Sequence, residues 1–193
     1  MFRCLKMCLV TCLIPLLLVG CSHGATPLEL SEQQLNERIR EQYREPRLLN
    51  LQLAWGASAQ LYVIGVELDL LGEGAVFYRV EGDFDVEFGG APMMNPVPFS
   101  LEARGTLGLV TEERALYPMQ LGVEQFTIET DVADVHLPLQ EILGQRVAQA
   151  LEDLAIYEFT ELQLPKPEQV VMLAIDADKL QLLRGDPSAI QPE

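Results

Sequence analysis

Apolar and polar residues alternate through the middle of the chain, and this alternation predicts β-strands. It is clearest in three segments, 62–70, 75–88 and 97–110, each of which has apolar residues on one face. In segment 75–88 the opposite face carries charged residues, namely Arg79, Glu81, Asp83, Asp85 and Glu87. A period of two with one apolar and one polar face is typical of antiparallel sheet that covers a core on one side and meets water on the other.

The residues expected on the core side follow from this parity. In the first segment they are Tyr62, Ile64, Val66, Leu68 and Leu70. In the second they are Val76, Tyr78, Val80, Phe84, Val86 and Phe88, with Gly82 among them. In the third they are Val97, Phe99, Leu101, Ala103, Leu107 and Leu109. We expect these side chains to form one continuous apolar face.

The alternation slips by one residue in the segment 119–135. Its first apolar residues, Met119, Leu121 and Val123, have odd numbers, whereas Phe126, Ile128 and Val132 have even numbers. One extra residue near position 124 or 125 would produce this slip, so the sequence predicts a β-bulge there.

Two segments have a helical period instead. Ser31 is a suitable N-cap and Gln34 completes a capping box, so the first helix is predicted to begin here and to end before Pro46. The second helix is predicted from Pro138 to about residue 155, because apolar residues recur there three and four positions apart. Its apolar side consists of Leu139, Ile142, Leu143, Val147, Ala150, Leu151 and Leu154.

These elements predict a single α+β domain over residues 31–184, with two shorter strands at 157–164 and 170–177 and a flexible tail at 185–193. Strands of about 14 residues would be roughly 45 Å long, whereas the second helix would be only about 24 Å long. Because long strands twist and coil, we expect a long antiparallel sheet curled around one or two amphipathic helices.

A sheet of this kind leaves two possibilities for the space between the sheet and the second helix. The first is an apolar trough that holds a ligand, and the second is a core that the protein's own side chains fill. The side chains expected to line a trough are Tyr78, Val80, Phe84, Phe99, Leu101, Phe126, Ile128 and Leu143.

The N-terminal residues have the layout of a secretory signal, with basic residues before an apolar run from Leu9 to Val19 that is too short to span a membrane. The run ends in Leu18-Val19-Gly20-Cys21, which resembles the lipobox of bacterial lipoproteins. This resemblance implies that residues 1–20 are removed and that Cys21 is lipidated. Residues 21–30 would then hold the lipidated cysteine and a tether. The alternative is an ordinary signal peptide with an incidental cysteine.

Cysteine positions and net charge narrow the possible partners. All four cysteines lie within the first 21 residues, so a mature chain beginning at Cys21 cannot form an internal disulfide. Loss of Arg3 and Lys6 with the signal would leave 11 basic against 29 acidic residues, a net charge of −18. Such a surface repels phosphate backbones, which argues against nucleic-acid binding. The membrane contact is therefore expected through the N-terminal lipid anchor.

The sequence contains no recognisable catalytic motif. The mature chain has two histidines, His23 and His136, which are too few for a convergent metal or nucleophile site. The acidic face of segment 81–87 has neighbours about 7 Å apart, so we expect a solvated surface, paired with Arg104 across the sheet, rather than a cation site. We expect Trp55 in the core and give Met93-Met94 little weight as metal ligands. The sequence therefore predicts no enzyme activity, no metal and no cofactor.

The order of the parts, from the lipobox to about residue 178, resembles the YceB-like family of bacterial lipoproteins. The matching parts are the lipobox, the helix that begins Ser31-Glu32-Gln33-Gln34-Leu35-Asn36, the long meander and a single later helix. That family is similar in fold to TULIP domains, the tubular lipid-binding modules of BPI-like proteins. The resemblance implies a lipoprotein that faces the periplasm and binds a lipid or another hydrophobic ligand.

Two functions are therefore expected as alternatives. The first is a membrane-anchored module that binds an acyl chain or phospholipid in the trough. The second is a structural or adaptor lipoprotein with a filled core that binds a protein partner of unknown identity. Ser22 after the cysteine resembles the pattern of lipoproteins sent to the outer membrane.

Overall fold

The computed structural model describes residues 27–52, 57–88, 91–92, 95–129 and 137–184. Several sequence predictions concern residues outside these ranges, namely Cys21 and most of its tether, Trp55, the Met93-Met94 pair, His136 and the tail 185–193.

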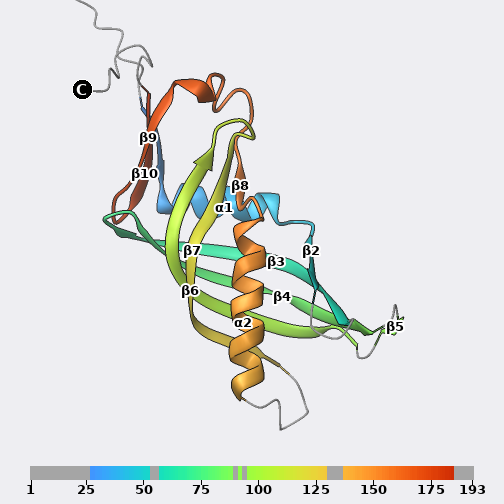
Figure 1. The fold of residues 1–193 in the computed structure, drawn as a ribbon. Coiled ribbons are helices and arrows are strands. Elements are labelled where there is room, and N and C mark those ends of the chain that lie inside the picture. The colour runs from blue at the N-terminus through green and yellow to red at the C-terminus, as the bar shows by residue number, and fades with distance from the viewer. Residues whose placement is uncertain (1–26, 53–56, 89–90, 93–94, 130–136, 185–193) are drawn as a thin grey trace, which may run out of the picture.

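Most of the described chain belongs to one antiparallel sheet with the strand order β2-β3-β4-β6-β7-β8 (Figure 1). Its strands are β2 (Arg47–Gln52), β3 (Ala57–Gly72), β4 (Ala75–Phe88), β6 (Val97–Val110), β7 (Ala115–Ile128) and β8 (Tyr157–Glu158). A two-residue strand, β5 (Ala91–Pro92), pairs with β4. The two central strands have the bounds that the alternation predicts, and the α+β class is confirmed.

A second, three-stranded sheet joins the two ends of the described chain. It consists of β1 (Leu28–Ser31), β10 (Lys179–Arg184) and β9 (Val170–Ile175), in that order. The predicted strand 157–164 is wrong beyond Glu158, because Gln163 N–H donates to Thr160 O and closes a turn. A short 3-10 helix, η2 (Pro167–Gln169), then leads into β9.

The predicted bulge in segment 119–135 is confirmed. In the β6–β7 ladder Glu102 pairs with Gln125 and Ala103 pairs with Val123, so Glu124 is the extra residue. The bulge returns the following residues to the core face, where Phe126 is 8% exposed.

A second bulge, in β3, overturns part of the face predicted for segment 62–70. Val63 pairs with Gly82 and Gly65 pairs with Glu81, which leaves Ile64 as the extra residue. The bulge reverses the parity, so Val63 is fully buried whereas Ile64 is 46% exposed. Val66, Leu68 and Leu70 do face the core as predicted.

Helix α1 (Glu32–Gln42) begins as the sequence predicts. The Ser31 hydroxyl accepts a hydrogen bond from Gln34 N–H, and the Gln34 side chain accepts one from Ser31 N–H. Helix α2 (Leu137–Glu152) ends a little earlier than predicted. In Figure 1 α2 crosses the main sheet, and it packs on β7, β6 and β2.

The prediction that the sheet curls around the helices is wrong. The main sheet is open, with β2 and β8 at opposite ends of its ladder. Side-chain amides of α1 occupy the backbone groups at the edges of β3 and β8, so these edges are not available to pair with each other.

Candidate ligand-binding region

The eight side chains predicted to line a trough belong to one apolar layer of the hydrophobic core, on the sheet face where α2 packs. Three come from β4, two from β6, two from β7 and one from α2. Seven of them are only 1–8% exposed, and Ile128 is partly buried. They are Tyr78, Val80, Phe84, Phe99, Leu101, Phe126, Ile128 and Leu143.

Strand register explains how this layer forms. Val80 lies opposite Leu101, and Leu101 lies opposite Phe126, so the three form one row across β4, β6 and β7. In the next row Phe99 lies between Gly82 and Ile128. Rows of large apolar side chains on one face are the main source of sheet stabilisation, and burial of each contributes roughly 1.5–3 kcal/mol.

Gly82 provides the space that the Phe99 ring occupies. A Cβ atom at position 82 would lie 2.8 Å from Cε1 of Phe99 and 2.3 Å from the Tyr62 carbonyl oxygen, which is too close for a real side chain. The Phe99 and Phe126 rings then approach with their centroids 6.0 Å apart and tilted by 39°, within the range that favours aromatic pairs.

Helix α2 rests on this layer through apolar residues. Leu143, Val147, Ala148 and Leu151 are at most 8% exposed. Gly144 allows the closest approach, since a Cβ atom there would lie 2.8 Å from Cβ of Phe126.

At the C-terminal end of α2 one polar contact supplements this packing. Leu121 N–H donates to Oε1 of Glu152 at 2.7 Å. Among the described residues this is the one side-chain hydrogen bond between α2 and the sheet.

The layer is filled by the protein's own side chains. The cavity near α1 and the grooves beside the β6–β7 turn are lined by other residues, and none of the eight predicted residues contributes to them. Of the two possibilities that the sequence left open, the described residues correspond to the filled core.

Tyr78 is the polar group within this layer. Its hydroxyl donates to Thr106 O at 2.5 Å, which satisfies the buried O–H. Burial raises the pKa of Tyr78 above its usual value, and the nearby Glu152 carboxylate raises it further. The phenol therefore remains neutral within the apolar layer.

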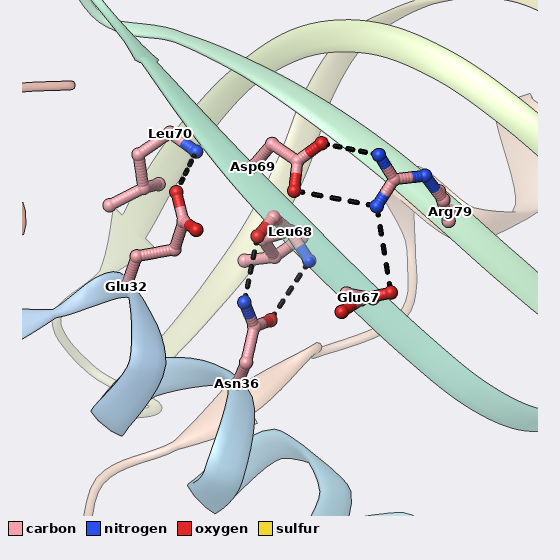
Figure 2. A network of polar contacts seen from close by, with 7 residues as sticks. All are labelled: Glu32, Asn36, Glu67, Leu68, Asp69, Leu70 and Arg79. Atoms are coloured by element: carbon pink, nitrogen blue, oxygen red, sulfur yellow. Dashed lines mark hydrogen bonds and ion pairs between the residues drawn. The ribbon is translucent and has the colours of Figure 1, made fainter. Parts of the chain in front are cut away.

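Helix α1 holds the edge of the main sheet by polar contacts (Figure 2). Asn36 Nδ2 donates to Leu68 O at 2.7 Å, and Leu68 N–H donates to Asn36 Oδ1 at 2.9 Å. Leu70 N–H donates to Glu32 Oε2 at 2.7 Å. These side chains take the place of a neighbouring strand and cover backbone groups that would otherwise form an open edge.

A similar pair of side-chain to backbone hydrogen bonds forms at the other end of α1. Gln42 Nε2 donates to Glu158 O at 2.8 Å, and Glu158 N–H donates to Gln42 Oε1 at 3.0 Å. Helix α1 therefore links the edge of β3 to the edge of β8. These contacts have a structural role, and the sequence alone did not predict one for the side chain of Asn36 or of Gln42.

The outer face of the sheet carries the charged pairs. Arg79 contacts Asp69 at 2.6 Å and Glu67 at 3.5 Å, as Figure 2 shows. The predicted pairing of Arg104 with the acidic face of β4 is wrong, because Arg104 pairs with Glu124 at 3.0 Å, next to the β7 bulge. The paired side chains are 36–58% exposed, so this part of the face is solvated and each pair contributes at most about 1 kcal/mol.

A cavity of about 230 Å³ lies between α1 and the bulge of β3. Its lining includes Arg40, Tyr43, Gly65 and Arg79. The Tyr43 hydroxyl is buried without a hydrogen-bond partner among the described residues, and burial raises its pKa. The cavity combines cationic and anionic side chains, so its lining does not select an apolar ligand.

The described residues contain neither a candidate metal site nor a helix able to span a membrane. No group of three or more His, Cys, Asp or Glu side chains in the described ranges could hold a metal ion. Within the same ranges no helix has the length and apolar character needed to cross a membrane.

Comparisons with known proteins identify no family for this chain. No family model matches the chain, and no curated protein matches it. One similar solved structure is that of a lipopolysaccharide binding protein, with 13% sequence identity and a TM-score of 0.27. The match covers 82% of this chain and 48% of the other, so the chain spans about half the length of that protein. At this TM-score the likeness carries no argument, and the resemblance to the YceB-like family stays a prediction.

Proposed function

We propose that this protein is a lipid-anchored module on the periplasmic side of a bacterial membrane, and that it binds an acyl chain or phospholipid between α2 and the main sheet. Cys21 would carry the anchor, and Ser22 favours the outer membrane. The module would not be an enzyme. Its task would be to hold an apolar ligand close to its own bilayer.

One observation carries this proposal. The eight predicted residues come from four separate elements and belong to one apolar layer of the core, on the sheet face where α2 packs. In the described residues α2 is held on that layer by apolar packing and by one hydrogen bond near its C-terminal end. Apolar packing is not directional, so a displaced helix can exchange contacts with β6 and β7 for contacts with an acyl chain.

The filled layer supports a second candidate, an adaptor lipoprotein that binds a protein partner. Its support is that side chains already occupy the space between α2 and the sheet, with Tyr78 and Leu101 each 1% exposed. An adaptor would have no need to open this layer.

Mass spectrometry of the purified protein separates the two candidates. Protein prepared without detergent, or refolded with phospholipid, is expected to carry a non-covalently bound acyl species in addition to the acyl groups on Cys21. Absence of any non-covalently bound acyl species in both preparations, beyond the acyl groups expected on Cys21, would favour the adaptor.

A matched pair of variants on α2 then locates the binding region. Leu143 is 8% exposed on the packed face of α2, whereas its neighbour Ile142 is 59% exposed. Leu143→Glu is expected to reduce binding of a fluorescent fatty acid at least tenfold, because a carboxylate would lie in the apolar layer. Ile142→Glu is expected to leave binding unchanged.

Circular dichroism of both variants tests whether they fold. If Leu143→Glu unfolds the protein, Leu143→Ala provides a milder change whose binding is compared with that of Ile142→Ala. Equal binding by a folded Leu143 variant and the unchanged protein would contradict the proposed location.

A further inference from the structure

The first described strand, β1, begins near an end of the molecule where apolar side chains are exposed. This end, which we call the tether end, consists of the β6–β7 turn at 111–114, the turn at 160–164 and strand β9. It occupies the upper part of Figure 1.

Strand pairing places the start of β1 near this end. Leu28, the first residue of β1, pairs with Leu182, and Leu182 pairs with Leu173 of β9. The start of β1 therefore lies two strands, about 10 Å, from Leu173. The chain from Cys21 to Leu28 spans at most about 25 Å, so a lipidated Cys21 would keep this end close to the bilayer.

Hydrogen bonds join the two turns of the tether end. Phe159 N–H donates to Arg114 O at 2.8 Å, and Arg114 Nε donates to Leu164 O at 3.1 Å. On the other side of the β6–β7 turn a groove of about 200 Å³ separates β6 from β9, with Thr111, Val170 and Met172 among its lining residues. The turns and β9 therefore form one continuous surface.

Two large apolar side chains project from this surface. Leu162 is 96% exposed, the highest value among the exposed large apolar residues of the described ranges. Met172, in β9, is 55% exposed. A single exposed apolar side chain is common on protein surfaces. What distinguishes these two is their place on the surface nearest the start of β1, where a lipid phase would cover them.

The charges of the tether end indicate which bilayer it fits. The exposed charged side chains of the tether end and of the adjoining segment 165–169 are Glu112, Glu113, Glu161, Glu168 and Lys166. This acidic excess opposes contact with an anionic surface and permits contact with a zwitterionic one.

We propose that the tether end lies against a zwitterionic lipid bilayer, with Leu162 and Met172 inserted at the boundary between headgroups and acyl chains. This inference rests on the anchor in the proposed function. It adds an orientation, in which the β6–β7 turn and β9 face the bilayer.

Depth-dependent quenching in vesicles tests this orientation. A mature chain whose Cys21 is lipidated has no other thiol, so one cysteine introduced at position 162, 172 or 142 carries a single fluorescent probe. Lipidated protein is inserted into vesicles of phosphatidylethanolamine and phosphatidylcholine that contain nitroxide-labelled lipids. The probes at 162 and 172 are expected to be quenched at least threefold more than the probe at 142. Equal quenching at the three positions would overturn the orientation.

A second set of variants supports or contradicts the role of Leu162. Leu162→Asp is expected to reduce quenching of the probe at 172 at least twofold, because a charge resists insertion, and Ile142→Asp is expected to leave it unchanged. Addition of anionic phosphatidylglycerol is expected to lower quenching at both 162 and 172. Unchanged quenching at 172 in the Leu162→Asp protein would show that Leu162 does not insert.

Failure of the anchor and failure of the orientation give different results. Mass spectrometry of the mature N-terminal peptide reports whether Cys21 is acylated. A chain without acylation contradicts the anchor in the proposed function, whereas an acylated chain without selective quenching contradicts only the orientation.

Discussion

The two helices of this protein are held in different ways. Helix α1 is fixed to the edges of the main sheet by side-chain amides and a carboxylate that bond directly to backbone groups of β3 and β8. Helix α2 rests on the face of the sheet through apolar side chains, with the Glu152–Leu121 hydrogen bond as its one polar link among the described residues.

This difference separates a structural element from a candidate moving part. Displacement of α1 would leave backbone N–H and C=O groups of β3 and β8 unpaired, which costs about 1–3 kcal/mol for each buried group. Displacement of α2 exposes apolar surface, a cost that an incoming acyl chain offsets by covering the same surface. A ligand is therefore expected to move α2 and to leave α1 in place.

The largest effect is expected from the α1 contact. Asn36→Leu keeps a side chain of similar size but removes both hydrogen bonds to Leu68, so unfolding should become easier by about 2–4 kcal/mol. Urea denaturation measures the change, and Glu41→Leu on the exposed side of α1 is the control. A loss below about 0.5 kcal/mol for Asn36→Leu would show that water replaces the amide.

A smaller effect is expected where α2 approaches the sheet. Gly144→Val places methyl groups against Phe126 and should cost about 1–3 kcal/mol through overpacking. Gln145→Val, on the exposed side of α2, should cost about 0.5 kcal/mol through helix propensity alone.

The same pair of variants also tests whether α2 is the mobile element. Hydrogen exchange of α2 amides should accelerate in the Gly144→Val protein while exchange in α1 stays unchanged. Equal acceleration in both helices would show that they open together and would remove the distinction between them.

The two bulges show how far the strand pattern could be predicted from the sequence. In β7 the apolar positions change parity at Glu124, with polar residues on both sides, so the extra residue was visible. In β3 the run from Leu61 to Val66 is apolar at every position except Gly65, so both parities fit and the bulge at Ile64 left no signal. Periodicity locates a bulge only where polar residues mark the other face.

The candidate site also shows a limit of prediction from sequence periodicity. The periodicity of the apolar residues predicted that the eight residues share one core, because burial follows that periodicity. It could not identify Asn36 or Gln42, since a polar residue in an amphipathic helix is expected to face water. Their partners are backbone groups on strands more than 30 residues away, and only the tertiary arrangement reveals them.

The smallest expected effect concerns two buried tyrosines, one beside each helix. Burial raises the pKa of Tyr43, the C-cap of α1, and of Tyr78, beneath α2, above the ordinary value of 10.0. Above pH 10 both phenols stay neutral in the folded chain but ionise in the unfolded chain. Their contribution to stability is therefore complete below pH 10 and is lost as the pH rises toward the folded pKa values. Difference titrations at 295 nm against Tyr43→Phe and Tyr78→Phe isolate the titration curve of each tyrosine.

In the Gly144→Val protein the pKa of Tyr78 should fall toward 10 while that of Tyr43 stays unchanged, because only α2 is displaced. A parallel fall for both tyrosines would mean that the amide contacts of α1 do not hold it independently of α2.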